Sequence, residues 1–462
     1  MVDRLRGIWA SPDLRKKILF TIGMLLIYRL ISHIPVPGID PSQVSKALSN
    51  PGNQSLSQVF GLLSVFSGGS VSYFSIVTLG VYPYITASIV VQLLQPIIPA
   101  LDRLQREGGE AGRNQLSQIT RYLTVPLAFL QGFGQLALFG SIGAVTSSQF
   151  GLFSASTFLP TLTALLAMTG GVMFLVWIGE VITENGIGNG ISLIIFTGIL
   201  SGIPPAVAQF FLSSGGNSSG TASAGTGTII QLLLALVLII ALVMLIVLVT
   251  MAERRVPVQY PTKRMIGRRS LMESRQNTYI PLRVNMGGMI PLIFAQSLLI
   301  FPVILASYLA VPSNPVKPIR DLFTWLQRAL DPSNWVYPVA FFVFVVAFTF
   351  FYATVLWEQQ NTADNLRKQG AFIAGVRPGG ATNEYLSKIL MRITLWGALF
   401  LALIAVMPFV FPQAFKLSRG LTSGGNGLLT AASLIIIVQV AIDTVRQVQS
   451  QLVMRNYSGF LR

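Results

Sequence analysis

The chain has 462 residues, of which 52% are apolar and only 10% are charged, and its mean hydropathy is +0.65. A soluble domain carries about 25% charged residues, so this composition excludes an ordinary soluble enzyme. The lack of cysteine and the single histidine, His33, exclude disulfides, thiol catalysis and clusters of metal-binding histidines. The formal net charge of +16 would point to nucleic acid in a soluble protein, but in a membrane protein it raises the question of sidedness.

Ten apolar segments are long enough to cross a membrane, because a bilayer core about 30 Å thick needs roughly 20 apolar residues in a helix. In chain order they are 18–36, 75–95, 121–141, 158–180, 190–211, 228–251, 286–311, 335–357, 390–411 and 424–442. Pro83, Pro204–Pro205 and Pro291 fall in the second, fifth and seventh segments, which should therefore bend or begin irregularly.

The basic residues are unevenly distributed between these segments. Of the 32 Lys and Arg, 25 lie in loops and tails that would face one side of the membrane, and six lie on the opposite side. The positive-inside rule then places both termini in the cytoplasm. The first segment has full spanning length and no small-residue cleavage site, so we expect a membrane helix there rather than a cleaved signal peptide.

The segments divide into two sets of five. We predict an N-terminal half over 1–212, an external linker over 213–227 and a C-terminal half over 228–462. An odd number of helices per half means that the second half enters the membrane from the opposite side, as in an inverted repeat. Gly80-x-x-Pro83-x-Ile85 and Gly288-x-x-Pro291-x-Ile293 echo each other, although chance could produce this in a chain with 42 Gly and 25 Pro. Inverted halves leave both a transporter and a channel open.

The predicted spans contain few ionisable residues. Arg29 is close enough to a helix end for its charge to reach water, and Glu180, Glu253, Glu358 and Asp443 lie at cytoplasmic ends. A charge at mid-bilayer costs roughly 3 kcal/mol and is kept for a function such as ion coupling. The sequence therefore disfavours a proton- or sodium-coupled carrier.

Enzyme chemistry finds no support either. One histidine cannot build H-E-x-x-H, no intramembrane aspartate pair is present, and the chain lacks a G-x-x-x-x-G-K-[ST] phosphate loop. Glu107, Glu110 and Arg103 could form an acid/base site, but a solvated cytoplasmic loop explains them better. We predict a non-enzyme without metal or cofactor, and energy must then come from a partner or from translation.

Two cytoplasmic loops, 253–285 and 358–389, are predicted to be structured. Alternation around Pro257 predicts a hairpin, Thr362–Lys368 a short amphipathic helix, and Gly375–Gly379 a turn. Such loops could dock an acidic partner, RNA phosphate or anionic lipid, or could reflect positive-inside charge alone. The candidate docking residues are Arg254, Arg255, Lys263, Arg264, Arg268, Arg269, Arg367, Lys368 and Arg377.

The apolar stretch between the first two spans, within residues 56–70, is too short to cross the membrane and too apolar for water. It could be a half-inserted helix lining a cavity, or an interfacial helix on the outer leaflet.

Several motifs, in order and at matching topological places, together resemble the bacterial SecY family, whose members form the central subunit of a protein-conducting channel. They are Ile34-Pro-Val-Pro-Gly-Ile-Asp40, Phe66-Ser-Gly-Gly69, Leu79-Gly-Val-Tyr-Pro-Tyr-Ile-Thr-Ala-Ser-Ile89, Gly186-Ile-Gly-Asn-Gly-Ile-Ser192, Val284-Asn-Met-Gly-Gly-Met-Ile-Pro291, Thr362-Ala-Asp-Asn-Leu-Arg-Lys368 and Gly375-Val-Arg-Pro-Gly379. The resemblance implies an all-α membrane protein with ten transmembrane helices in two inverted halves of five around a central pore.

The resemblance also implies roles for particular residues. Segment 56–70 would be the plug that closes the channel, with Phe60, Leu63, Phe66, Gly68 and Gly69 as its candidates. A ring of six apolar side chains would grip the passing polypeptide at the waist: Ile85, Ile89, Ile191, Ile195, Ile290 and Ile436. Such a constriction blocks ions by dewetting, although packing against neighbouring helices is the alternative for any single isoleucine. Ile436 is the weakest of the six, because Thr430-Ala-Ala-Ser433 departs from the glycine-rich approach expected in the family.

The implied partners are the small subunits SecE and SecG, the SecA ATPase, the ribosome and its RNA, signal peptides, nascent chains and anionic lipids. Unfolded secretory proteins would pass across the membrane, and hydrophobic segments would leave sideways between helices two and three and helices seven and eight. The expected location is the plasma (inner) membrane, or a thylakoid membrane if the chain comes from a cyanobacterium or plastid.

Overall fold

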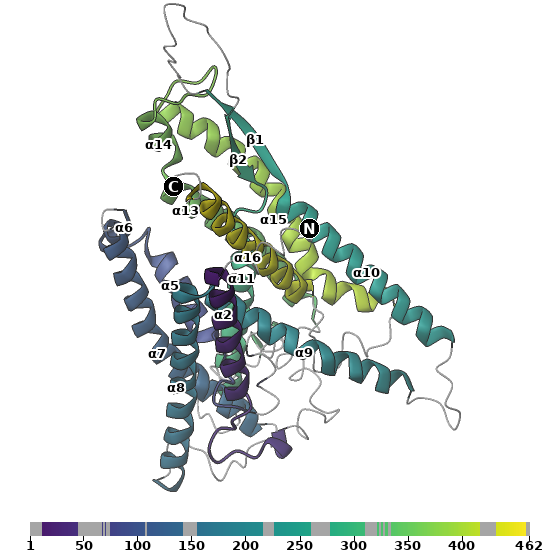
Figure 1. Cartoon of the computed structure of the whole chain (residues 1–462). Helices are drawn as coiled ribbons and strands as arrows, with labels where there is room; N and C mark the ends of the chain where they lie inside the picture. Colours follow the sequence, from purple (N-terminus) through teal and green to yellow (C-terminus); the bar gives the residue numbers. More distant parts are fainter. Residues whose placement is uncertain are drawn as a thin grey trace, which may run out of the picture.

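Figure 1 shows a computed structural model of the whole chain. The structure describes residues 12–44, 67, 70, 74–106, 109–141, 155–215, 226–259, 278–309, 321–322, 325–326, 329–330, 334–415 and 431–458. Long helices dominate these residues, and one two-stranded antiparallel sheet lies at the upper end of the molecule in Figure 1.

The long helices of the described residues each overlap one of the ten predicted segments. They are α2 (Pro12–Ile31), α5 (Tyr82–Leu94), α7 (Gly109–Ser141), α8 (Ala155–Asn185), α9 (Gly190–Gly215), α10 (Thr226–Met251), α11 (Ile290–Leu309), α13 (Val336–Gln360), α15 (Gly380–Phe415) and α16 (Ala431–Ser458). Shorter elements are α6 (Pro99–Arg106), α14 (Thr362–Lys368), β1 (Glu253–Val258) and β2 (Thr278–Arg283).

Helix ends differ from the predicted segment ends for a physical reason. Helices α7 and α15 begin well before residues 121 and 390, because helical hydrogen bonding continues into charged sequence that an apolar scan does not count. Conversely, α5 begins only at Tyr82, with a proline in its first turn, where the missing proline N–H costs no helical hydrogen bond. The predicted irregular starts are confirmed for α5 and α11, whereas α9 continues through Pro204–Pro205 as one helix.

By length and composition, three helices in the described residues could cross a membrane: Thr157–Asn185, Val336–Lys368 and Gly380–Met407. A fourth span is the pair Tyr82–Leu94 and Pro99–Gln105, if its 103° bend is taken as a break within one span. Shorter apolar helices run over Gly190–Pro204, Ile239–Met251 and Ile290–Ile300. The chain is thus a multi-pass membrane protein, and the count of ten spans stays a prediction.

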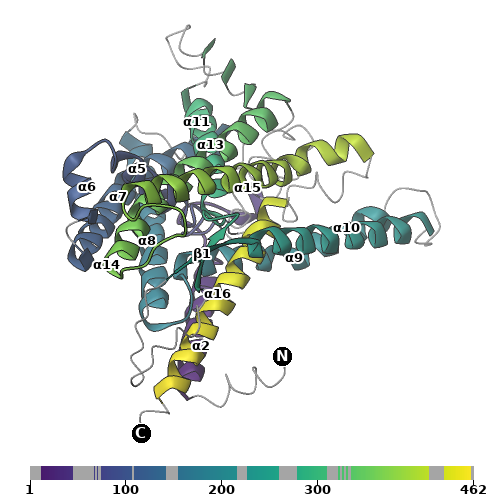
Figure 2. The same cartoon turned by 90° about the horizontal axis from the view of Figure 1, so that it is seen from above.

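The main helix contacts fall into two groups, and Figure 2 shows the helices from above. In the first, α7 packs against α5 and α8, and α8 also packs against α2 and α9. In the second, α13 packs against α11 and α15, and α16 packs against α10 and α15. The groups meet where α11 contacts α5 and α7 and where α16 contacts α9. The inverted relation of the halves and the linker at 213–227 stay predictions.

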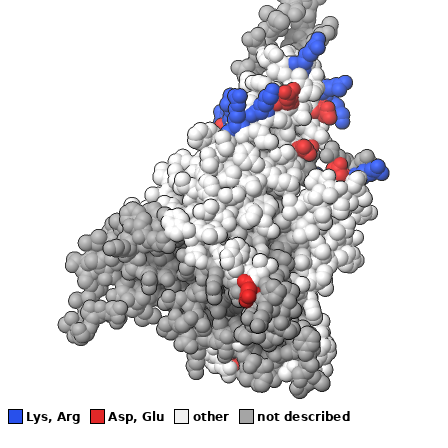
Figure 3. Space-filling model, turned by 180° about the vertical axis from the view of Figure 1, so that it is seen from behind, with Lys and Arg blue, Asp and Glu red and all other residues white. Residues whose placement is uncertain are grey.

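Two apolar clusters stabilise these elements. The large central cluster draws buried side chains from both groups of helices, and a smaller one lies between the sheet, α14 and the start of α15. Large apolar side chains are also exposed on the outside of the helices, such as Leu30 at 72% and Trp396 at 72%. In Figure 3 the visible Lys and Arg gather at one end, and the described region below them is mostly white, with a few red Asp or Glu side chains. This distribution suits a molecule whose middle lies in lipid.

Candidate functional site

All six predicted ring isoleucines lie in or against the large apolar cluster. Ile85 and Ile89 come from α5, Ile191 and Ile195 from α9, Ile290 from α11 and Ile436 from α16. Four are buried, and Ile191 and Ile290 are partly buried against the cluster. The structure therefore brings the six into one apolar region, which they share with many other side chains, and their role as a ring stays a prediction.

The two Gly-x-x-Pro-x-Ile patterns adopt the same backbone geometry. Gly80 and Gly288 have φ values of +57° and +61°, a region that glycine enters without the penalty of a Cβ atom. In both copies the helix begins two residues later, at Tyr82 in α5 and at Ile290 in α11. The faint echo in the sequence therefore corresponds to a repeated local structure at the start of two helices that contact each other.

This repeat bears on which isoleucine of α11 corresponds to Ile85. The pattern aligns Ile85 with Ile293, and these side chains are 7% and 5% exposed. Ile290, the predicted ring residue, is aligned with Tyr82 instead. Helix α11 thus offers two ring candidates, Ile290 and Ile293, and experiments on the waist should include both.

Hydrogen bonds link the helices that meet at one seam of the molecule, α5, α7 and α11. The Tyr82 hydroxyl on α5 donates to the Ser297 carbonyl oxygen on α11 over 2.8 Å. The Gln131 amide on α7 donates to the Thr86 hydroxyl on α5 over 3.1 Å. The first bond links the two groups of helices, and the second lies within the first group.

Three buried glutamines near this seam were missed from the sequence. Gln131 and Gln135 lie on α7 and Gln296 on α11, and each has a buried amide oxygen without a hydrogen-bond partner in the described part of the chain. An unsatisfied buried amide costs free energy, so these groups would gain from water if the seam opened. The spacing of Gln131 and Gln135, four residues apart in an apolar segment, was the available signal.

The predicted plug lies mostly outside the described residues, including Phe60, Leu63, Phe66, Gly68 and Gly69. Its described end is buried and hydrogen-bonded. The Tyr28 hydroxyl of α2 donates to the Ser67 carbonyl oxygen over 3.3 Å, and the Ser70 hydroxyl donates to the carbonyl oxygens of Ser67 and Val77.

The segment that follows is tied to the motif after α2. The Val36 amide donates to the Phe74 carbonyl oxygen, and the Ile76 amide donates to the Ile34 carbonyl oxygen, both over 2.9 Å. The backbone of Ile76 also lies so close to α8 that a Cβ atom on Gly171 would come within 2.3 Å of its carbonyl oxygen. The backbone of residues 74–76, directly after the predicted plug, is therefore in close contact with two neighbours, the motif after α2 and helix α8.

The predicted hairpin is confirmed. Strands β1 and β2 pair in antiparallel register from Glu253 opposite Arg283 to Val258 opposite Thr278. Arg255 bonds the Glu253 carboxylate over 2.9 Å and places its guanidinium 4.7 Å from the centre of the Tyr279 ring. The hydrogen bond to Glu253 raises the pKa of Arg255.

Arg254 and Arg255 are exposed on this hairpin. The basic residues expected near its tip lie outside the described residues: Lys263, Arg264, Arg268 and Arg269.

The two predicted docking loops form one structural unit, which the sequence did not reveal. Gln259, just past β1, and Phe372, just past α14, exchange backbone hydrogen bonds of 2.9 and 3.0 Å. Beneath this bridge, side chains from the hairpin, the end of α13, α14 and α15 share the smaller apolar cluster. Its buried members are Val256, Val258, Leu282, Trp357, Leu366, Ala371, Ile373, Leu386, Ile389, Leu390 and Ile393.

The short helix α14 and the glycine-flanked turn expose their basic residues, as predicted. Arg367, Lys368 and Arg377 are all exposed. The Thr382 hydroxyl fixes the turn by donating to the Arg377 carbonyl oxygen over 2.8 Å. The hairpin, α14 and the Arg377 turn thus present their basic side chains from one packed unit rather than from two separate loops.

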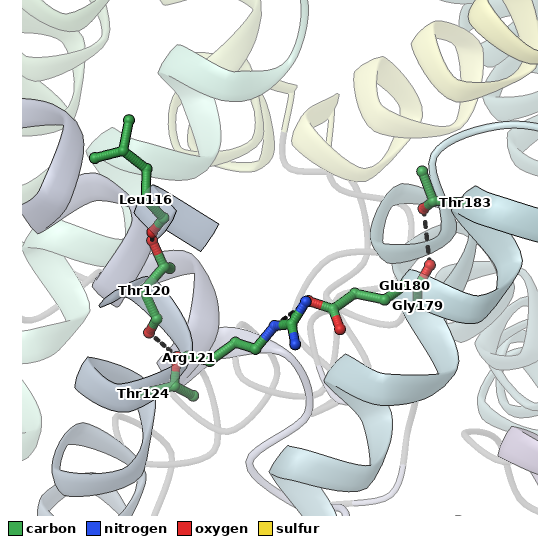
Figure 4. Close-up of polar contacts among 7 residues, drawn as sticks. All are labelled: Leu116, Thr120, Arg121, Thr124, Gly179, Glu180 and Thr183. Atoms are coloured by element: carbon green, nitrogen blue, oxygen red, sulfur yellow. Dashed lines mark hydrogen bonds and ion pairs between the residues drawn. The ribbon is translucent and has the colours of Figure 1, made fainter. Parts of the chain in front are cut away.

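An ion pair joins α7 to α8. The Arg121 Nε lies 2.6 Å from the Glu180 Oε1, with side chains 43% and 21% exposed (Figure 4). The Glu180 carboxylate is therefore neutralised by an ion pair with Arg121. Of the acid/base alternative, Arg103 and Glu110 are exposed on α6 and α7, in agreement with solvated residues.

A family model described as SecY matches residues 75–445. The chain belongs to the SecY family. It is 41% identical over 475 residues to the protein translocase subunit SecY of Streptomyces galbus, with 100% of both chains covered. It is 40% identical over 455 residues to that of Mycobacterium tuberculosis strain H37Rv, with 98% of both covered.

Solved structures share the fold of this SecY-family chain. A study of how the plug domain of SecY stabilises the closed state of the translocation channel contains a chain with a TM-score of 0.58 and 16% identity. Sec61 in a canine ribosome–channel complex from the endoplasmic reticulum gives a TM-score of 0.55 and 14% identity. Each likeness covers 94% of this chain and 92% of the other.

Proposed function

We propose that this chain is the channel subunit of a protein translocase, which passes unfolded secretory proteins across the membrane and releases hydrophobic segments sideways into lipid. The observation that carries the proposal is the gathering of the six isoleucines in one apolar region, from helices of both groups. A narrow apolar waist offers a passing chain no specific hydrogen bonds and excludes ions by dewetting.

The seam between α5, α7 and α11 supports the proposed lateral exit. Two groups of helices meet there, and the bond from Tyr82 to Ser297 crosses the boundary. Separation of α5 and α7 from α11 and α13 would open the waist toward lipid and would expose the buried glutamine amides to water. In this proposal the chain has ten transmembrane helices in two inverted halves, and the seam lies between these halves. The chain would lie in the plasma membrane with both termini in the cytoplasm.

The basic unit of hairpin, α14 and the Arg377 turn is the proposed docking surface for the SecA motor and for the ribosome. Its packed core would hold the exposed arginines in fixed positions, and RNA phosphate or acidic side chains complement them. Small SecE and SecG subunits would complete the assembly. Segment 56–70 would close the outer side of the waist until a substrate displaces it.

Reconstitution tests this function. The chain, with the partner subunits encoded in its own genome, is placed in proteoliposomes with its motor, ATP and a radiolabelled secretory precursor. We expect precursor protected from added protease, and none in vesicles that lack this chain. Saturable uptake of a small solute without precursor protection would contradict the proposal and would favour a carrier.

A further inference from the structure

One face of α16 runs from the apolar waist to water. Ile436, Gln439 and Asp443 are spaced three and four residues apart, so they lie along one side of the helix. Ile436 is fully buried, Gln439 is 5% exposed, and Asp443 is exposed. The face therefore begins at a proposed ring residue and ends at a carboxylate in contact with solvent.

The starts of α9 and α11 flank this end of α16. A Cβ atom on Gly288 would lie 3.2 Å from the Gln439 Nε2, and one on Gly188 would lie 3.5 Å from the Thr444 Oγ1. These glycines precede the helices that carry Ile191 and Ile290. Asp443 thus lies one turn beyond Gln439. The starts of α9 and α11, the helices that carry Ile191 and Ile290, lie next to this part of α16.

The Asp443 carboxylate and the Gln439 amide together offer more hydrogen-bond acceptors than donors. The Gln439 Nε2 donates to the Asp443 Oδ2 over 3.2 Å, while the buried Gln439 Oε1 has no partner among the described residues. In the described part of the chain, Asp443 makes no ion pair, and Arg446, one turn further along α16, does not approach it within 4.0 Å. A carboxylate and a neighbouring amide oxygen without a cation form a site for an ammonium or guanidinium group.

The surroundings make this acidic group unusual. The loops on its predicted side hold 25 of the chain's 32 Lys and Arg, so a cationic segment would be repelled from most of that surface. Signal sequences carry a positively charged stretch directly before their apolar stretch. A ligand with this pattern matches the α16 face in both charge and order, with its cation at Asp443 and its apolar part toward Ile436.

We propose that Asp443, with the Gln439 Oε1, binds the Lys or Arg residues that precede the apolar stretch of a signal sequence. This inference rests on the proposed channel function and adds a specificity-determining residue to it. The site would hold the charged end of the signal on the cytoplasmic side while the apolar stretch reaches the waist.

Asp443→Asn tests the proposal because it removes the charge and keeps the shape. The matched control is Glu110→Gln, which removes an exposed carboxylate at the start of α7 on the same predicted side. Each variant is reconstituted with its partners and given a precursor with four, two or no Lys before the apolar stretch. We expect Asp443→Asn to slow the four-Lys precursor about two- to fivefold, the range for an ion pair near water, and to leave the precursor without Lys unchanged.

Direct contact is tested by carbodiimide coupling of carboxylates to amines in a stalled four-Lys precursor. A coupled peptide that joins Asp443 to a signal Lys, absent in Asp443→Asn, is expected. Equal slowing of all three precursors, equal effects of the two variants, or no coupled peptide at Asp443 would overturn the inference. Failure of the unmodified channel to protect any precursor would instead overturn the proposed function.

Discussion

The Tyr82 hydroxyl on α5 donates a hydrogen bond to the Ser297 carbonyl oxygen on α11, across 215 residues of sequence. Both residues are buried, at 1% and 0% exposure. The bond joins the two groups of helices at the proposed lateral exit. It therefore stabilises the closed seam and must break when α5 and α11 separate.

Tyr82→Phe should favour opening of the seam. A net hydrogen bond contributes about 1 kcal/mol, which corresponds to roughly a fivefold shift in the open-to-closed ratio. We expect faster translocation of precursors with weakly apolar signals, measured as the initial rate of protease protection. Tyr122→Phe, at a 77% exposed position on α7, is the control. The same rate in both variants would argue against a role for the bond.

Replacing the waist side chains with glycine should open a path for ions. In an Ile85→Gly, Ile195→Gly, Ile436→Gly variant, loss of the branched side chains removes the apolar constriction that repels water. We expect a conductance in planar bilayers well above that of the unmodified chain. The control is Val90→Gly with Leu200→Gly, which weakens α5 and α9 in the same way at positions 38% and 47% exposed. A silent triple variant, or an equally conductive control, would contradict the seal.

Two adjacent glycines of α8 should respond differently to alanine. At Gly171 the new methyl group would lie 2.3 Å from the Ile76 carbonyl oxygen, so α8 and the segment that follows the plug must separate. A Cβ atom added at Gly170 would meet nothing within 4 Å. Alanine at this position should therefore stabilise the helix by about 0.5–1 kcal/mol. We expect a lower unfolding temperature in detergent for Gly171→Ala and an equal or higher one for Gly170→Ala. The reverse order would show that the close approach is wrong.

Charge reversal at Arg377 should impair partner-driven transport without unfolding the docking unit. The side chain is exposed, whereas its backbone carbonyl holds the turn, so Arg377→Glu changes charge and leaves the fold. We expect a large loss of SecA- or ribosome-driven translocation with normal membrane insertion. Lys388→Glu applies the same charge change on α15, where an exposed ion pair with Glu384 contributes little stability. Normal transport by Arg377→Glu would exclude Arg377 from docking.

Much of the fold follows from local sequence patterns. The long apolar runs predict the helices, alternation around Pro257 predicts the hairpin, and polar spacing in 362–368 predicts α14, because each depends on neighbours within a few residues. The helix ends were less predictable, since α7 and α15 extend through charged residues that lie outside the apolar segments.

Contacts between distant segments could not be predicted in this way. The bridge from Gln259 to Phe372 merges two loops that the sequence treats separately, and the bond from Tyr82 to Ser297 joins the two groups of helices. Both depend on how the helices pack in three dimensions. The repeated Gly-x-x-Pro-x-Ile pattern did predict a repeated local structure, because Gly80 and Gly288 have similar positive φ values, +57° and +61°.

Disulfide capture of a stalled precursor tests the apolar waist most directly. The chain has no cysteine, so single cysteines can be placed at Ile85, Ile89, Ile191, Ile195, Ile290, Ile293 and Ile436, with Val90, Leu200 and Leu298 as outward-facing controls on α5, α9 and α11. The precursor carries one cysteine in its mature part. We expect adducts at waist positions from both groups of helices and none at the controls, with α11 captured through Ile290 or Ile293. Adducts confined to the outward-facing positions would contradict a central apolar passage.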